Sequence, residues 1–157
     1  MNYEPVRLKH GSQQGPPDVS ENGRKLDLQV IFTDLPKTAA ALAKARSMAR
    51  GLGIHITLLV ARVVPYPLPL AEPDVSVEFT EHLLESLACE RDADDTDVEI
   101  YLCRDRNETI RRVLPPDSLV IVGATKRRWW PSAWFTWERS LAQMLRRDGR
   151  RVLVVTI

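Results

Sequence analysis

Two residues that follow apolar runs could take part in ligand binding. Asp34 comes soon after residues 26–32, "LDLQVIF", and Gly123 closes residues 117–123, "DSLVIVG". A carboxylate after a strand either accepts hydrogen bonds from a ribose or a base, or caps the following helix. A glycine there either lets the backbone approach a phosphate closely or serves a turn. The sequence leaves both interpretations of each residue open.

Three further residues have the chemistry to hold an anion. Lys126 and Arg127 come directly after Gly123, and their side chains could contact phosphate oxygens. Ser140 could donate its hydroxyl near a helix N-terminus. The alternatives are a solvated charge run for the two basic residues and an inert mid-helix position for the serine.

All four tryptophans of the chain lie within residues 126–140. With Lys126 and Arg127 they could stack and hold nucleic acid, but their spacing favours another role. Side chains spaced by four, three, four and three residues lie on one face of a helix. This spacing links Trp130, Trp134, Trp137, Leu141 and Met144 into one predicted stripe. Packing or protein contact through Trp129 and the other tryptophans is therefore favoured over an altered ligand loop, and nucleic acid is the least favoured partner.

Catalytic and metal-binding patterns are missing from the sequence. It holds no Gly-x-Ser-x-Gly elbow, no His-Glu-x-x-His and no Walker loop. The acidic stretch 91–97 lacks the glycine and the terminal Glu of a calcium loop. Cys89 and Cys103 fall in a predicted helix and a predicted strand, so we expect two buried free thiols. We expect no enzyme activity and no metal.

The elements that position these residues alternate regularly after residue 25. Residues 1–25 are polar and rich in Gly, Pro and Gln, and we expect a flexible leader. From residue 26 to residue 157 the pattern predicts a single α/β domain. The predicted strands are 26–32, 54–64, 97–103, 117–123 and 150–157, and the predicted helices are 36–53, 74–91, 105–114 and 134–147. Nearly continuous Val, Ile and Leu in the strands predict a mainly parallel sheet covered on both faces, a Rossmann-like three-layer sandwich.

Charge is distributed unevenly along the chain, although the net charge is only +1. Residues 1–103 carry ten Lys and Arg against sixteen Asp and Glu, a net of −6, and residues 104–157 carry twelve against five, a net of +7. An electropositive end would suit an anionic ligand or partner. No apolar run reaches the roughly 20 residues that span a bilayer, and the N-terminus has no signal core, so we expect a cytoplasmic protein that is not embedded in a membrane.

Three local stretches resemble universal stress protein domains. They are "LAKARSMARGLGIHITLLVARV", "DSLVIVGATKRR" and "RSLAQMLRRDGRRVLVV". The resemblance covers residues 26–157 and implies five parallel strands in the order 3-2-1-4-5. It also implies a homodimer joined along the C-terminal strands, and in many members an adenine nucleotide. The nucleotide is held by an Asp after strand 1, here Asp34, by backbone near Val60 on strand 2, and by a phosphate loop.

The chain departs from the family at that phosphate loop, which reads Gly, two residues, Gly, nine residues, Gly, then Ser or Thr. Gly123 matches the first glycine, but Lys126 stands at the second and Arg139 precedes Ser140 at the third. Twelve residues instead of nine lie between Lys126 and Arg139. Lost glycines place Cβ atoms where backbone amides should wrap a phosphate.

Three functions follow from the resemblance and the departure. The first is a regulatory or adaptor domain without catalysis, with weak or absent binding of ATP or another adenine nucleotide. The second is a genuine nucleotide-binding stress protein that uses Asp34, Gly123, Lys126, Arg127 and Ser140. The third is a protein-interaction module, since similar domains accompany transporters and sensor kinases.

Overall fold

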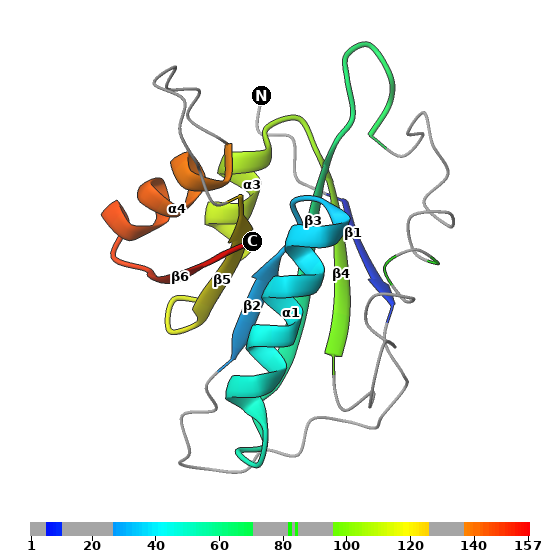
Figure 1. The fold of residues 1–157 in the computed structure, drawn as a ribbon. Coiled ribbons are helices and arrows are strands. Elements are labelled where there is room, and N and C mark those ends of the chain that lie inside the picture. The colour runs from blue at the N-terminus through cyan, green and yellow to red at the C-terminus, as the bar shows by residue number, and fades with distance from the viewer. Residues whose placement is uncertain (1–5, 11–26, 71–81, 83, 85–95, 126–136) are drawn as a thin grey trace.

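The chain folds around a six-stranded sheet with helices on both faces (Figure 1). The computed structural model describes residues 6–10, 27–70, 82, 84, 96–125 and 137–157. The strands are β1 (Val6–His10), β2 (Leu28–Ile31), β3 (Ile56–Val63), β4 (Thr96–Cys103), β5 (Leu119–Ala124) and β6 (Arg151–Thr156), and the described helices are α1 (Leu35–Ala49), α3 (Arg106–Val113) and α4 (Trp137–Arg147).

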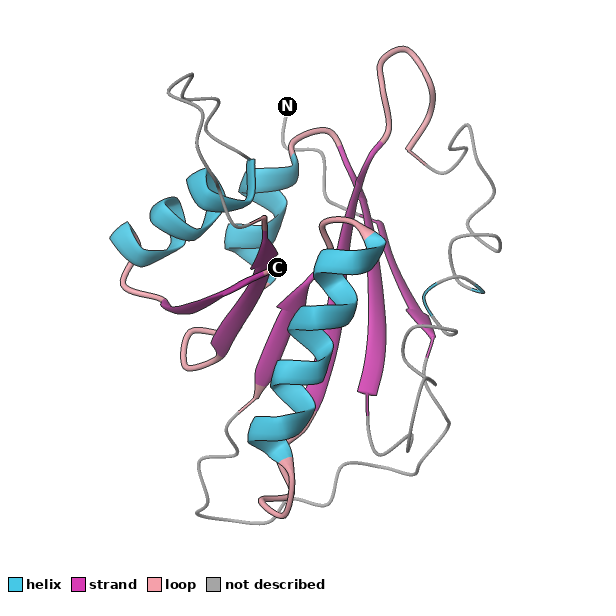
Figure 2. Ribbon diagram, viewed as in Figure 1, coloured by secondary structure: helices cyan, strands magenta, loops and turns pink. Residues whose placement is uncertain are grey.

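The sheet has the order β1-β4-β3-β2-β5-β6. Strands β2 to β6 are mutually parallel, so in chain order they run 3-2-1-4-5, and the predicted α/β architecture is confirmed. β2 lies at the centre, with Ile31 level with Leu59 of β3 on one side and with Val122 of β5 on the other. Figure 2 shows that α1 follows β2, that α3 follows β4 and that a segment containing α4 follows β5 along the chain.

The sixth strand was not expected from the sequence. β1 pairs antiparallel with β4, from Val6 opposite Leu102 to His10 opposite Val98. These five residues are the described part of the expected flexible leader, and here they form part of the sheet. Their alternation of apolar and basic residues, "VRLKH", suits a strand, but the pairing partner that stabilises it lies about ninety residues away in the chain. β1 covers an edge that β4 would otherwise present to solvent.

Two separate hydrophobic clusters lie on the two faces of the sheet. One contains Val30 and Leu58 together with Leu42 and Ala45 of α1. The other contains residues that alternate with these on the strands, among them Ile31, Leu59 and Val122, together with Ile110 of α3 and Leu141 and Leu145 of α4. Successive side chains of a strand point to opposite faces, so the nearly continuous apolar runs supply both clusters.

The predicted helix 74–91 lies almost wholly outside the described residues. His82 and Leu84 are helical, and Leu84 is fully buried in the cluster on the α1 face. Among the described residues, no helix is long and apolar enough to cross a membrane.

Candidate functional site

The candidate site lies at the carboxyl ends of β2 and β5. From β2 the chain proceeds outward through β3 and β4, and it then returns to the other side of β2 to form β5 and β6. The order of strands therefore reverses between β2 and β5, which is where open α/β sheets bind their ligands. The helices that follow these two strands, α1 and α4, lie on opposite faces of the sheet.

Asp34 caps α1. Its backbone is extended, and Oδ1 accepts a hydrogen bond from the Lys37 backbone N–H at 3.0 Å. Pro36 lies in the first turn of the helix, where a missing N–H costs nothing. Thr38 Oγ1 accepts a hydrogen bond from the Thr33 N–H at 3.1 Å, which fixes the backbone just ahead of the cap. Of the two roles open for Asp34 in the sequence, the cap is the one formed in the structure.

Lys37 crosses from α1 to α4. Its Nζ lies 2.7 Å from Asp34 Oδ2 and 2.6 Å from Glu138 Oε1, in the first turn of α4. The side chains of Lys37 and Glu138 are 16% and 10% exposed, whereas that of Asp34 is 44% exposed. A single ammonium group therefore bridges two carboxylates across the point where the strand order reverses.

The protonation of this triad is set by its own contacts. The side-chain hydrogen bond to Asp34, followed by that to Glu138, raises the pKa of Lys37 above its usual value of 10.5. Burial acts to raise the pKa of Asp34, but hydrogen bonds from the Lys37 side chain and backbone outweigh it and lower that pKa below 3.8. Lys37 is therefore cationic and Asp34 anionic throughout the physiological range.

Gly123 is where α1 touches the end of β5. A Cβ added to Gly123 would lie 2.2 Å from the backbone oxygen of Lys37 and 2.6 Å from its carbonyl carbon. No side chain fits in that space without moving the helix. The described contact of Gly123 is thus with the first turn of α1.

Trp137 pins the beginning of α4 against the beginning of α3. Its Nε1 donates to Asn107 Oδ1 at 2.9 Å, and the Arg106 guanidinium lies over its ring, 4.6 Å from the centroid. The ring packs against the cluster that contains Leu141, so the expected helical stripe is confirmed for its described members. Two residues further on, Arg139 donates to the carbonyl of Thr125 at 3.4 Å.

Arg104, which directly follows β4, holds the segment that follows β3. Arg104 donates to the carbonyls of Val64 at 2.7 Å and Leu68 at 2.6 Å, and its guanidinium lies over the Tyr66 ring. Next to it, Cys103 is buried and free, as expected, and burial raises the pKa of its thiol.

The other residues selected from the sequence are placed as follows. Val60 lies within β3, level with Ile100 of β4, three residues before that strand ends. Ser140 is half-buried in α4, four positions into the described helix. The remaining selected residues, Lys126, Arg127, Trp129, Trp130 and Trp134, lie outside the described residues, and so does Cys89.

Sequence reasoning missed Lys37 and Glu138. Lys37 is one of three basic residues in the Ala-rich helix α1, and the sequence does not distinguish it from the other two. Glu138 carried a usable signal, because it lies three and seven residues before Leu141 and Leu145 and so shares the buried face of α4. A carboxylate on an apolar stripe requires a partner, here supplied by a residue 101 positions away.

Within the described residues, no group of three or more His, Cys, Asp or Glu side chains is arranged to hold a metal ion. In the described triad the ammonium of Lys37 lies between the carboxylates of Asp34 and Glu138, and it thereby joins α1 to α4. Asp34 also caps α1.

Comparison with known proteins supports the fold. A scan against protein-family models gives no match, and neither does a search of curated proteins. Among solved structures, the chain resembles the crystal structure of a protein from the universal stress protein family from Burkholderia pseudomallei, with a TM-score of 0.56 and 16% identity. The match covers 87% of this chain and 98% of that one. The chain thus has a universal-stress-protein-like fold.

Proposed function

We propose that the protein is a cytoplasmic, non-catalytic regulatory or adaptor domain whose binding of adenine nucleotides is weak or absent. The fold supports a position for a ligand at the ends of β2 and β5. The residues there favour the chain's own contacts over a ligand.

The Lys37 bridge is the observation that carries this proposal. A ribose hydroxyl at Asp34 would compete with an ammonium group 2.7 Å from Oδ2 and an amide 3.0 Å from Oδ1. Releasing Lys37 to admit it would also break the 2.6 Å contact between Nζ and Glu138, whose carboxylate is largely shielded from water. An incoming nucleotide would need to repay both costs.

Gly123 gives independent support. The space that its missing side chain leaves is taken up by the backbone of Lys37. The phosphate role expected for that glycine would require the first turn of α1 to lie elsewhere.

The test is a titration of ATP, AMP and a cyclic dinucleotide, followed by tryptophan fluorescence and repeated by calorimetry. Trp137 adjoins Glu138 and is therefore placed to respond. We expect no saturable signal up to about 1 mM, which corresponds to a binding free energy weaker than about −4 kcal/mol. Saturation at micromolar ligand, abolished by Lys126→Ala, would instead establish the genuine nucleotide-binding function.

We further propose a homodimer joined along β6. β6 is an edge of the sheet, and the side chains from Val152 to Val155 are only half-buried. Pairing two such edges would cover them and satisfy their backbone groups. Light scattering at tens of micromolar, a regime of ordinary specific dimers, should give twice the mass of the chain. A monomer mass would refute this assembly without bearing on nucleotide binding.

A further inference from the structure

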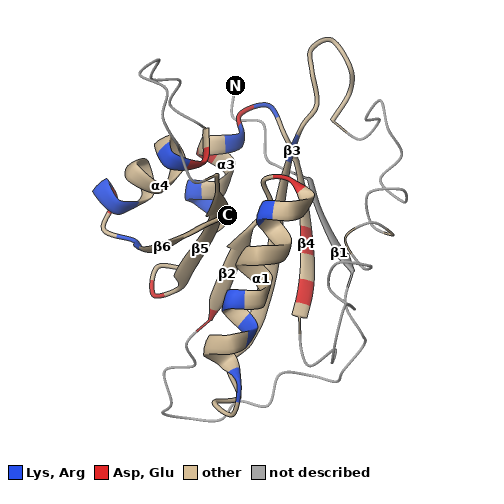
Figure 3. Cartoon of the chain, viewed as in Figure 1, with Lys and Arg blue, Asp and Glu red and all other residues tan. Residues whose placement is uncertain are grey.

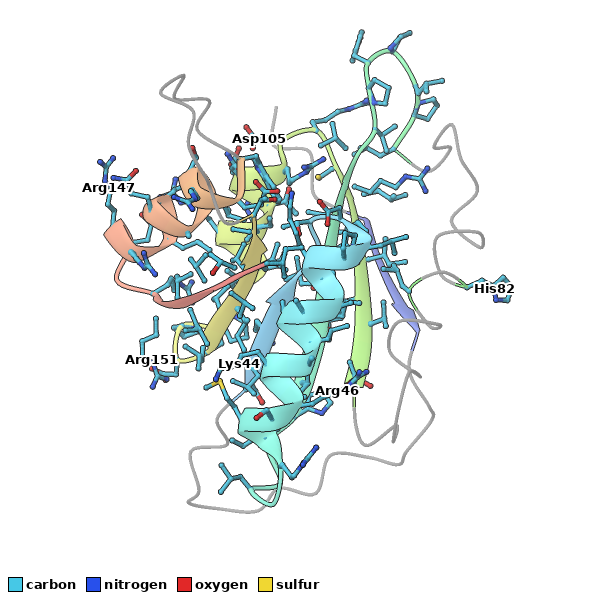
Figure 4. The ribbon with its side chains drawn as sticks, in the orientation of Figure 1. Lys44, Arg46, His82, Asp105, Arg147 and Arg151 are labelled. Carbon is cyan, nitrogen blue, oxygen red and sulfur yellow. The ribbon has the colours of Figure 1, made fainter. Side chains whose placement is uncertain are left out.

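The turn between α4 and β6 has the sequence "RRDGRR", residues 146–151, with four arginines in six positions. Two further arginines end α3 beside it, and we call the six residues the arginine corner: Arg111, Arg112, Arg146, Arg147, Arg150 and Arg151. It lies where α4 ends and β6 begins, whereas the Lys37 bridge lies at the first turn of α4, and Figure 4 shows Arg147 and Arg151 projecting outward on either side of the turn between α4 and β6.

The turn has a well-defined backbone. Gly149 has φ of 79°, its N–H bonds to the Arg146 carbonyl at 3.0 Å, and the Arg150 N–H bonds to the Leu145 carbonyl at 2.9 Å. This is the Schellman arrangement that ends many helices. Asp148 adds a two-point ion pair to Arg111, with distances of 2.6 and 3.1 Å. The helix side and the strand side of the turn are thereby held in one geometry.

Three of the arginines are positioned by backbone carbonyls. Arg146 donates to Val152 at 3.0 Å, Arg151 donates to Asp117 at 2.6 Å, and Arg150 donates to Pro115. A carbonyl takes up one of the five N–H donors of a guanidinium but leaves its full positive charge. These contacts orient the cations without neutralising them.

The corner carries a local excess of positive charge. Its six arginines outnumber the three carboxylates of the neighbouring segments, Glu108, Asp117 and Asp148, which leaves a net of +3. Arg111 and Arg112 are paired with Asp148 and Glu108. Among the described residues, no carboxylate lies within ion-pair distance of the other four arginines. Figure 3 shows these basic segments adjoining at the end of α4 and the beginning of β6.

The ordinary explanation for arginines at a helix end accounts for four of the six. Cations in the last turn complement the helix dipole, which covers Arg111 and Arg112 of α3 and Arg146 and Arg147 of α4. Arg150 and Arg151 follow the helix and donate to the carbonyls of Pro115 and Asp117, which joins the turn to the segment before β5. These contacts leave the charge of both guanidinium groups available to a partner.

We propose that the arginine corner docks a short acidic segment of another protein. Guanidinium groups bind carboxylates through paired hydrogen bonds, and a fixed set of them favours a partner with several carboxylates. Such a partner needs only the exposed guanidinium groups of the corner, so the docking is compatible with pairing along β6.

The charge of the whole chain favours such a local partner over a long polyanion. Nucleic-acid-binding domains are typically strongly basic, whereas this chain has a sequence pI of about 7.8 and a net charge of +1.

This docking names the class of partner that the proposed adaptor would bind. It rests on the proposed function only for its biological meaning, because binding of an acidic peptide can be measured on its own. The assay uses the full chain and a short fluorescein-labelled oligo-aspartate, followed by fluorescence anisotropy at low ionic strength. We expect saturable binding that weakens strongly as salt rises to about 0.15 M, where charges more than about 8 Å apart are screened.

Arg147→Gln is the informative variant, because Arg147 is exposed and its removal disturbs none of the contacts above. We expect this variant to weaken binding about threefold, as loss of one exposed ion pair does. The double variant Arg147→Gln with Arg151→Gln should weaken binding about tenfold. Arg50→Gln is the matched control: it removes an exposed arginine from the end of α1, on the other face of the sheet, and should leave binding unchanged.

Three results would overturn the proposal: no binding of oligo-aspartate at low salt, equal losses in Arg147→Gln and Arg50→Gln, or preference for an oligonucleotide or for anionic phospholipid vesicles over the peptide. Either of those preferences would assign the corner to phosphate instead. The nucleotide titration depends on residues at the carboxyl ends of β2 and β5, away from the arginine corner. Each experiment can therefore fail without the other.

Discussion

Replacing Lys37 by Met is the sharpest test of the bridge between α1 and α4. Methionine keeps the length and apolar stem of the side chain and removes the charge. The contact to Asp34 is half-exposed, and such a pair contributes about 0.5 kcal/mol. The contact to Glu138 is largely shielded, and losing it costs about 1.5 kcal/mol, because the carboxylate stays behind in a poorly solvated position. We therefore expect the free energy of unfolding to fall by about 2 kcal/mol.

The measurement is urea denaturation near neutral pH, followed by circular dichroism. Lys44→Met is the control, since Lys44 is an exposed lysine on the same helix and should change the unfolding free energy by less than about 0.5 kcal/mol. Glu138→Gln, with and without Lys37→Met, completes a double-mutant cycle, for which we expect a coupling of about 1.5 kcal/mol. Equal effects of Lys37→Met and Lys44→Met would refute the bridge.

The pH dependence of the difference between wild type and Lys37→Met provides a second readout. The folded pKa of Asp34 is lowered, so its contribution is present above the unfolded pKa, near 3.8, and is lost as pH falls through the folded value. The folded pKa of Lys37 is raised, so its contribution is present below 10.5 and is lost as pH rises through the folded value. The difference should be flat between these limits and shrink outside them. A steep slope around neutral pH would contradict the assignment.

Two other substitutions test the packing around the site. Gly123→Ala should lower the free energy of unfolding by about 1–3 kcal/mol, because the new Cβ meets the carbonyl of Lys37, and a thermal melt indistinguishable from wild type would contradict this close approach. Trp137→Phe should cost about 1 kcal/mol through loss of the hydrogen bond to Asn107, and the same loss should appear in Asn107→Ala. Combining these two changes should cost less than the sum of their separate effects in urea denaturation, whereas full additivity would show that the two side chains do not interact.

Local patterns were sufficient to place the parallel strands and the described helices. Runs such as "LDLQVIF" and "DSLVIVG" are apolar on both faces, and this is what a strand covered on both sides needs. The boundaries of α3 followed from Asp105, which accepts from the Glu108 N–H at 2.9 Å, and from the prolines after it. These signals lie within one turn or one strand of the element they define.

The candidate site was harder to read, because its contacts join distant parts of the chain. Asp34 and Gly123 were selected for the right positions, but the sequence offered each of them two roles. The choice depended on Lys37, whose backbone fills the space at Gly123 and whose ammonium reaches Asp34. Lys37 lies only three residues after Asp34, but nothing in the sequence around Gly123 indicates its contact with Lys37.

The sequence by itself determined the order of the elements and the two-sided burial of the sheet, because hydrophobic periodicity and helix caps act over a few residues. It also determined that residues 104–157 are basic, with twelve Lys and Arg against five Asp and Glu. Only the tertiary structure decided that β1 joins the sheet, that Lys37 links Asp34 to Glu138, and that Arg111 of α3 pairs with Asp148 after α4. Each of these depends on groups brought together across long stretches of chain, and their free energy comes from distance and burial, which residue types alone do not specify.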